Sequence, residues 1–189
     1  ATGAVLTALT ALVVLGGMKS IRTACERLVP LVVLVYTVGC LAVIFRNHSV
    51  LGESLRLIFT QAFDFRAAAG GLAGAAALRA LRYGVSRGLF SNEAGMGTSA
   101  IAVSAMEPGH PARQAMAGAT ATFWDTVVFC AITGLAFVTA QVRDPAAFAG
   151  LDGLAYCFAV FRQIPGGGFI LLFSLLLLGF ACIIGWCYI

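Results

Sequence analysis

Three long apolar stretches constrain the fold of this chain more than any other feature of its sequence. They cover residues 28–45, 115–140 and 169–189. A helix that crosses a bilayer needs about 20 consecutive, mostly apolar residues, and each stretch comes close to or exceeds that length. Of the 189 residues, 60% are hydrophobic and 11% are charged, whereas soluble domains carry about 25% charged residues. The sequence therefore predicts an all-α integral membrane protein, built as a helix bundle.

The remaining segments complete a predicted bundle of several spans in a single transmembrane domain over residues 1–189. Residues 19–27 are expected to be a polar connector, residues 46–66 to hold a short amphipathic helix at the membrane interface, and residues 142–168 to be a long connector. The chain starts at Ala1 and ends inside an apolar stretch, so we expect a fragment of a longer polypeptide. The predicted spans are residues 1–17 (partial), 28–45, 67–106 (broken), 115–141 and 168–189.

Charge and cysteine content argue against several classes of function. The net charge is +4, but the basic residues are scattered singly through the loops, so no nucleic-acid partner is expected. The six cysteines form no CxxC pair, which favours free, buried thiols that act as small apolar residues over a metal site or a disulfide framework. We expect neither a metal nor a cofactor.

Residues 84–99 (GVSRGLFSNEAGMGTS) are the least regular apolar part of the chain. They contain four glycines, three serines, one asparagine, one threonine, one arginine and one glutamate. An unbroken helix in lipid is weakened by glycine and by ionic groups. Two interpretations fit this composition equally well. Residues 82–93 are either a loop outside the membrane, or part of a discontinuous helix whose unwound backbone lines a cavity at membrane depth.

The string RGLFSNEAGMG at residues 87–97 resembles the signature of the alanine/glycine:cation symporter family, also called sodium:alanine symporters. The resemblance extends over nearly the whole chain, in order and spacing. It implies the leucine-transporter fold, with two inverted five-helix repeats, and this chain would run from the end of helix four through helix eight. Residues 91–97 would be the unwound centre of helix six. The other matching segments are GGMKSI at 16–21, ERLVP at 26–30, FWDT at 123–126 and IGWCY at 184–188.

The resemblance also implies a substrate site around the break in helix six. One aromatic side chain there would pack on a small substrate, polar groups would contact its charged ends, and the glycines would supply torsions that other residues reach only with strain. Trp186 would cap the pocket, although an interfacial anchor is the other interpretation of a tryptophan at that position. The predicted substrate-binding residues are Phe90, Ser91, Asn92, Ala94, Gly95, Gly97 and Trp186.

Structural or coupling roles are predicted for Glu93, Asp125 and Thr126. Glu93 would brace the break from inside the bundle. Asp125 lies ten residues into an apolar stretch, where a lone carboxylate is costly. It is either a partner for a neighbouring helix, through Thr122, Thr126 or the break, or an ion ligand. Cys182 stands where relatives usually carry threonine near a sodium site, and Na⁺ prefers oxygen to sulfur. The coupling ion is therefore Na⁺ or, alternatively, H⁺.

The predicted function is secondary active transport. The chain would belong to a sodium-coupled symporter for alanine, glycine or a similar small neutral amino acid, working by alternating access in the cell (inner) membrane. Its partners would be the amino acid, the sodium ion, the bilayer and the rest of the same polypeptide. A structural or anchoring membrane subunit without transport is one alternative. An intramembrane enzyme that uses Glu93 and Asp125 as an acid/base pair is another.

Overall fold

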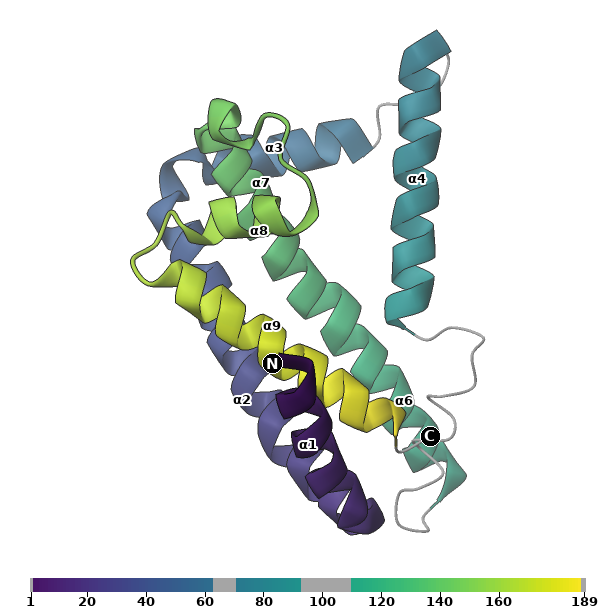
Figure 1. Ribbon diagram of the computed structural model, residues 1–189. Coiled ribbons are helices and arrows are strands. Elements are labelled where there is room, and N and C mark those ends of the chain that lie inside the picture. Colours follow the sequence, from purple (N-terminus) through teal and green to yellow (C-terminus); the bar gives the residue numbers. More distant parts are fainter. Residues whose placement is uncertain (1, 63–70, 93–109, 188–189) are drawn as a thin grey trace. The chain divides into compact units, whose positions relative to one another are not determined.

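The computed structural model describes residues 2–62, 71–92 and 110–187, and these ranges contain helices and turns but no strand (Figure 1). The all-α prediction is confirmed. The helices are α1 (Thr2–Leu15), α2 (Gly17–Arg46), the short 3₁₀ helix η1 (His48–Val50), α3 (Leu51–Ala62), α4 (Gly71–Ser91), α6 (Pro111–Phe123), the π-helix η3 (Trp124–Phe129), α7 (Cys130–Arg143), the 3₁₀ helix η4 (Pro145–Phe148), α8 (Gly153–Phe161) and α9 (Gly167–Trp186).

Three helices among the described residues are long and apolar enough to cross a membrane. They are Gly17–Arg46, Pro111–Arg143 and Gly167–Trp186, and the second of these joins α6, η3 and α7 into one rod. Many large apolar side chains on these helices are exposed, including Leu34, Phe45 and Phe169. A soluble protein rarely exposes so much contiguous apolar surface, whereas a bilayer solvates it. The chain is therefore a multi-pass membrane protein.

The prediction of a polar connector at residues 19–27 is wrong, because these residues form the first turns of α2. Their charges are compatible with a helix: Arg22 Nε and Glu26 Oε1 lie 2.7 Å apart, one helical turn from each other. The boundary between α1 and α2 comes before residue 19, at Gly17, where φ is +74°. This left-handed conformation suits glycine because a side chain would be strained there.

The interpretation of residues 82–93 as a loop is also wrong for the part that the structure describes. Helix α4 continues to Ser91, and Asn92 forms a turn directly after it. Within residues 46–66, α3 is the helix that the amphipathic pattern predicts. The expectation of buried cysteines holds for Cys40, while Cys130, Cys182 and Cys187 are exposed.

The chain divides into two units, residues 1–48 with 139–189 and residues 49–138. In the first unit, α1 and α9 pack along α2, and α8 packs against both α2 and α9 (Figure 1). Gly39 makes this packing close, because a Cβ atom there would lie 2.8 Å from Phe161 Cε1 and 3.1 Å from Ile170 Cγ2. Phe161 is fully buried and its ring centroid lies 5.8 Å from that of Tyr36. Phe161 is the last residue of α8, so this packing fixes the position at which α8 ends.

Candidate functional site

Four polar side chains meet within the second unit, where the end of α4 lies against η3. The Ser91 hydroxyl donates to Asp125 Oδ2 over 2.7 Å. Asn92 Nδ2 lies 3.1 Å from Thr126 Oγ1, to which it can donate a hydrogen bond. Thr126 Oγ1 in turn lies 3.2 Å from Asn92 Oδ1 and can donate to it. Two consecutive residues of one segment thus pair with two consecutive residues of another. We call Ser91, Asn92, Asp125 and Thr126 the polar quartet.

Local backbone structure positions both halves of the polar quartet. At the end of α4, the backbone N–H and the side-chain Nδ2 of Asn92 both donate to the Gly88 carbonyl, over 3.1 Å and 3.0 Å. On the other side, Asp125 and Thr126 lie in the π-helix η3, and the Cys130 N–H bonds to the Asp125 carbonyl five residues back. Single π-helical turns inside α-helices often occur at functional sites.

The polar quartet offers mainly oxygen atoms in an apolar setting. Asp125 lies within the candidate span Pro111–Arg143, where an unpaired carboxylate would be costly. The hydrogen bond that Asp125 accepts from the Ser91 hydroxyl lowers that cost. Carboxylate, hydroxyl and carbonyl oxygens are suitable ligands for a hard cation or a substrate ammonium.

The structure brings together four of the residues named from the sequence, and these form the polar quartet. Phe90 lies beside them on α4 with 64% of its surface exposed. The roles predicted for these side chains stay predictions. The other predicted residues of the break, Glu93, Ala94, Gly95 and Gly97, lie outside the described residues.

Trp186 and Cys182 belong to the first unit, where both lie on α9. Trp186 is the last residue of that helix and 52% of its surface is exposed. Cys182 is exposed as a free thiol. A pocket role for Trp186 and an ion-site role for Cys182 stay predictions.

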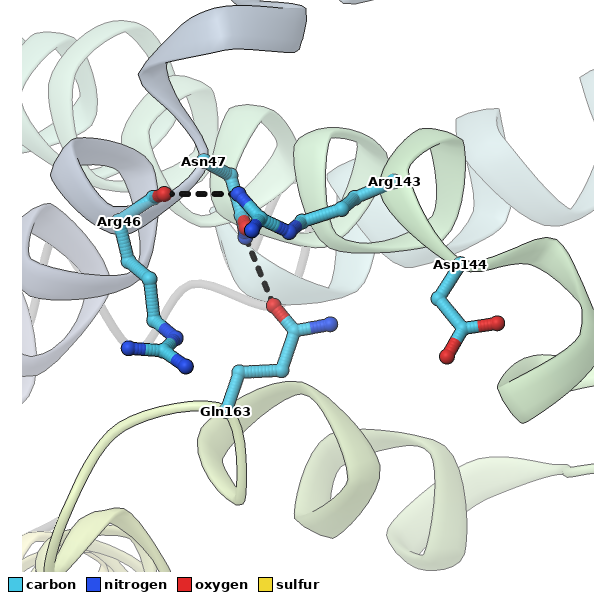
Figure 2. A pocket seen from close by; sticks show the side chains of 5 residues that line it. All are labelled: Arg46, Asn47, Arg143, Asp144 and Gln163. Atoms are coloured by element: carbon cyan, nitrogen blue, oxygen red, sulfur yellow. Dashed lines mark hydrogen bonds between the residues drawn. The ribbon is translucent and has the colours of Figure 1, made fainter.

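Sequence reasoning missed a second polar group, at the ends of α2 and α7 in the first unit. A cavity of about 310 Å³ lies there, lined by Arg46, Asn47, Arg143, Asp144 and Gln163 (Figure 2). These residues are far apart in the sequence and form no motif. One signal could have pointed to them: Arg46 directly follows the apolar stretch 28–45, and Arg143 comes three residues after the end of the stretch 115–140.

The family model of the sodium:alanine symporter family matches residues 1–189. The chain belongs to the sodium:alanine symporter family. Membership of this family supports the prediction of a transmembrane protein for amino-acid transport. It also places the chain among transporters and not among enzymes, so the alternative of an intramembrane enzyme is wrong.

Individual members of the sodium:alanine symporter family resemble the chain along almost its full length. The sodium/alanine symporter AgcS of Methanococcus maripaludis is 38% identical over 188 residues, which cover 99% of this chain and 41% of that protein. A transporter of Haemophilus influenzae is 36% identical over 187 residues, which again cover 99% of this chain and 41% of that protein. The probable sodium/glutamine symporter GlnT of Bacillus subtilis is 39% identical over 136 residues, 72% of this chain and 27% of GlnT. The chain thus spans about two fifths of the length of the first two relatives.

Proposed function

We propose that this chain is the middle part of a secondary active transporter that moves alanine, glycine or a similar small neutral amino acid together with Na⁺. The complete transporter would include further helices of the same polypeptide and adopt the leucine-transporter fold in the cell (inner) membrane. Relatives named as sodium/alanine and sodium/glutamine symporters support this class of substrate.

The polar quartet is the observation on which the proposal rests. Two hydroxyls, an amide and a carboxylate gather at the end of α4, against the π-helical part of an apolar span. A purely structural span has no need for this costly arrangement in lipid. A transporter does, because the oxygens replace the hydration shell of a cation or an ammonium group that crosses the bilayer.

Each residue of the quartet would have a distinct part in transport. The Asn92 amide can both donate and accept, so it suits a zwitterion that carries a carboxylate and an ammonium. Asp125 would orient Ser91 and keep the end of α4 close to η3. Alternating access would then expose this site to either side of the membrane in turn. No covalent step is involved.

A sodium-jump uptake assay on the complete transporter in proteoliposomes tests this function. Uptake of labelled alanine or glycine should follow an inward Na⁺ gradient and collapse when an ionophore dissipates that gradient. An anchoring subunit without transport would give no uptake under either condition. Uptake that follows a proton gradient and ignores Na⁺ would contradict Na⁺ as the coupling ion.

The coupling ion can be examined further at Cys182. Since Na⁺ prefers oxygen to sulfur, Cys182→Thr should lower the Na⁺ concentration for half-maximal uptake if position 182 lies near the ion. The exposed Cys187 on the same segment supplies the matched control, Cys187→Thr. An unchanged Na⁺ dependence in Cys182→Thr would exclude this side chain as a ligand.

A further inference from the structure

The cavity at the ends of α2 and α7 lies where two candidate spans stop being apolar. Arg46 is the last residue of α2 and Arg143 the last residue of α7. The two helix ends are joined, because Arg143 Nη1 donates to the Arg46 carbonyl over 3.0 Å (Figure 2). Arginines that directly follow an apolar span lie at the level of the lipid headgroups. The cavity therefore opens at the height of the lipid phosphates.

Its cationic groups are available to an anion. The Arg46 guanidinium, within the described ranges, makes no hydrogen bond or ion pair, and Arg143 uses one nitrogen for the Arg46 carbonyl. A guanidinium presents five N–H donors in a plane that matches the oxygens of a phosphate. Two such groups around one cavity favour a phosphate ligand.

The same cavity also contains acceptor groups. Asn47 is fully buried, and its Nδ2 donates to Gln163 Oε1 over 2.7 Å. Its Oδ1 has no hydrogen-bond partner among the described residues. A buried acceptor without a donor is costly and rare. Asp144 adds an exposed carboxylate to the cavity wall, and its Oδ1 accepts from the Ala147 N–H over 3.3 Å. An ammonium can reach the exposed Asp144 carboxylate, whereas Asn47 Oδ1 has no surface open to a ligand.

We propose that this cavity binds a phospholipid headgroup that joins a phosphate to a primary ammonium, as in phosphatidylethanolamine. The phosphate contacts Arg46 and Arg143, and the ammonium donates to the Asp144 carboxylate. Asp144 disfavours headgroups that carry only negative charge, such as phosphatidylglycerol. The trimethylated nitrogen of phosphatidylcholine has no N–H to donate. A volume of about 310 Å³ lies at the lower end of the range of small-ligand sites, about 300–1,000 Å³.

Lipid titration of the delipidated complete transporter in detergent, followed by native mass spectrometry, tests this site without any transport measurement. Phosphatidylethanolamine should bind roughly tenfold more tightly than phosphatidylcholine or phosphatidylglycerol of the same chain length, as expected for charge-assisted hydrogen bonds. Equal binding of the three lipids, or tighter binding of phosphatidylglycerol, would overturn the proposal.

A variant pair then assigns the site. Arg46→Gln should weaken phosphatidylethanolamine binding roughly tenfold, because a charged partner of the phosphate is lost. Arg162→Gln removes an equal charge next to Gln163 but outside the cavity lining, so it should leave binding unchanged. Equal effects of the two variants would overturn the assignment. Inorganic phosphate or free alanine that displaces the lipid at equal concentration would show a site for soluble ligands and would also overturn it.

Discussion

The two polar groups of this chain differ in how their side chains are satisfied. In the polar quartet, within an apolar span, Ser91, Asn92, Asp125 and Thr126 bond to one another. At the ends of α2 and α7, the exposed Arg46 guanidinium instead has no hydrogen-bond partner among the described residues. Depth in the membrane explains the contrast. Polar groups in hydrocarbon must be paired inside the protein, whereas those at the headgroup level can be paired by lipid or water.

The largest effect is expected when one member of the polar quartet is removed. Asn92→Leu deletes both hydrogen bonds to Thr126 and puts an apolar group in the proposed substrate site. We expect sodium-driven uptake by the complete transporter to be abolished, a fall of about 100-fold or more, because contacts to both ends of a zwitterion are lost. Membrane insertion should be intact, as measured by the yield of folded protein in detergent.

Thr120→Val is the matched control for Asn92→Leu. It removes a hydroxyl from the same candidate span but outside the quartet. Thr120 Oγ1 donates to the Met116 carbonyl of its own helix. Uptake should stay close to that of the parent. Normal transport by Asn92→Leu would remove Asn92 from the substrate site.

Asp125→Asn separates the effect of the Asp125 charge from that of its hydrogen bond with Ser91. The asparagine Oδ1 can still accept from Ser91, so if Asp125 only orients the break, uptake should fall by about fivefold or less with an unchanged Na⁺ dependence. Loss of a charged ion ligand would instead raise the Na⁺ concentration for half-maximal uptake severalfold. Asp152→Asn, before α8, is the control, since its side chain makes no cap hydrogen bond.

The sequence predicts the spans and names the members of the polar quartet, but it does not predict all of the structure around them. Asp125 could be expected to need a partner, because a carboxylate in an apolar stretch is costly, and the Ser91 hydroxyl is that partner. The π-helix η3 is a backbone adjustment without a residue signature. The prediction of a connector at residues 19–27 fails because charges spaced one turn apart suit a helix as well as a loop. The cavity residues are joined only by tertiary packing, which a single sequence does not reveal.

A third prediction concerns the packing that holds Gln163 against Asn47. Gly39→Val would force a side chain into Phe161 and Ile170, and Phe161 precedes Gln163 by two residues. We expect the protein to lose about 1–3 kcal/mol of stability, as for other overpacked cores, measured as a lower thermal midpoint in detergent. Gly179→Val on α9 is the control, because no atom lies within 4 Å of the added Cβ. Equal stability of the two variants would contradict the close packing of α2 on α8.

The smallest effect is expected for a neutral hydrogen bond at the level of the loops. The Tyr156 hydroxyl donates to Gln141 Oε1 over 2.9 Å. Burial raises the pKa of Tyr156, so this hydroxyl is protonated and donates at neutral pH. Because water can replace the lost partner there, Tyr156→Phe should cost about 1 kcal/mol or less, with the exposed Tyr83→Phe as control. If Tyr156→Phe were as destabilising as Gly39→Val, access to water would not determine how much a polar pair contributes to the stability of this protein. The contrast between the two polar groups would then need another cause.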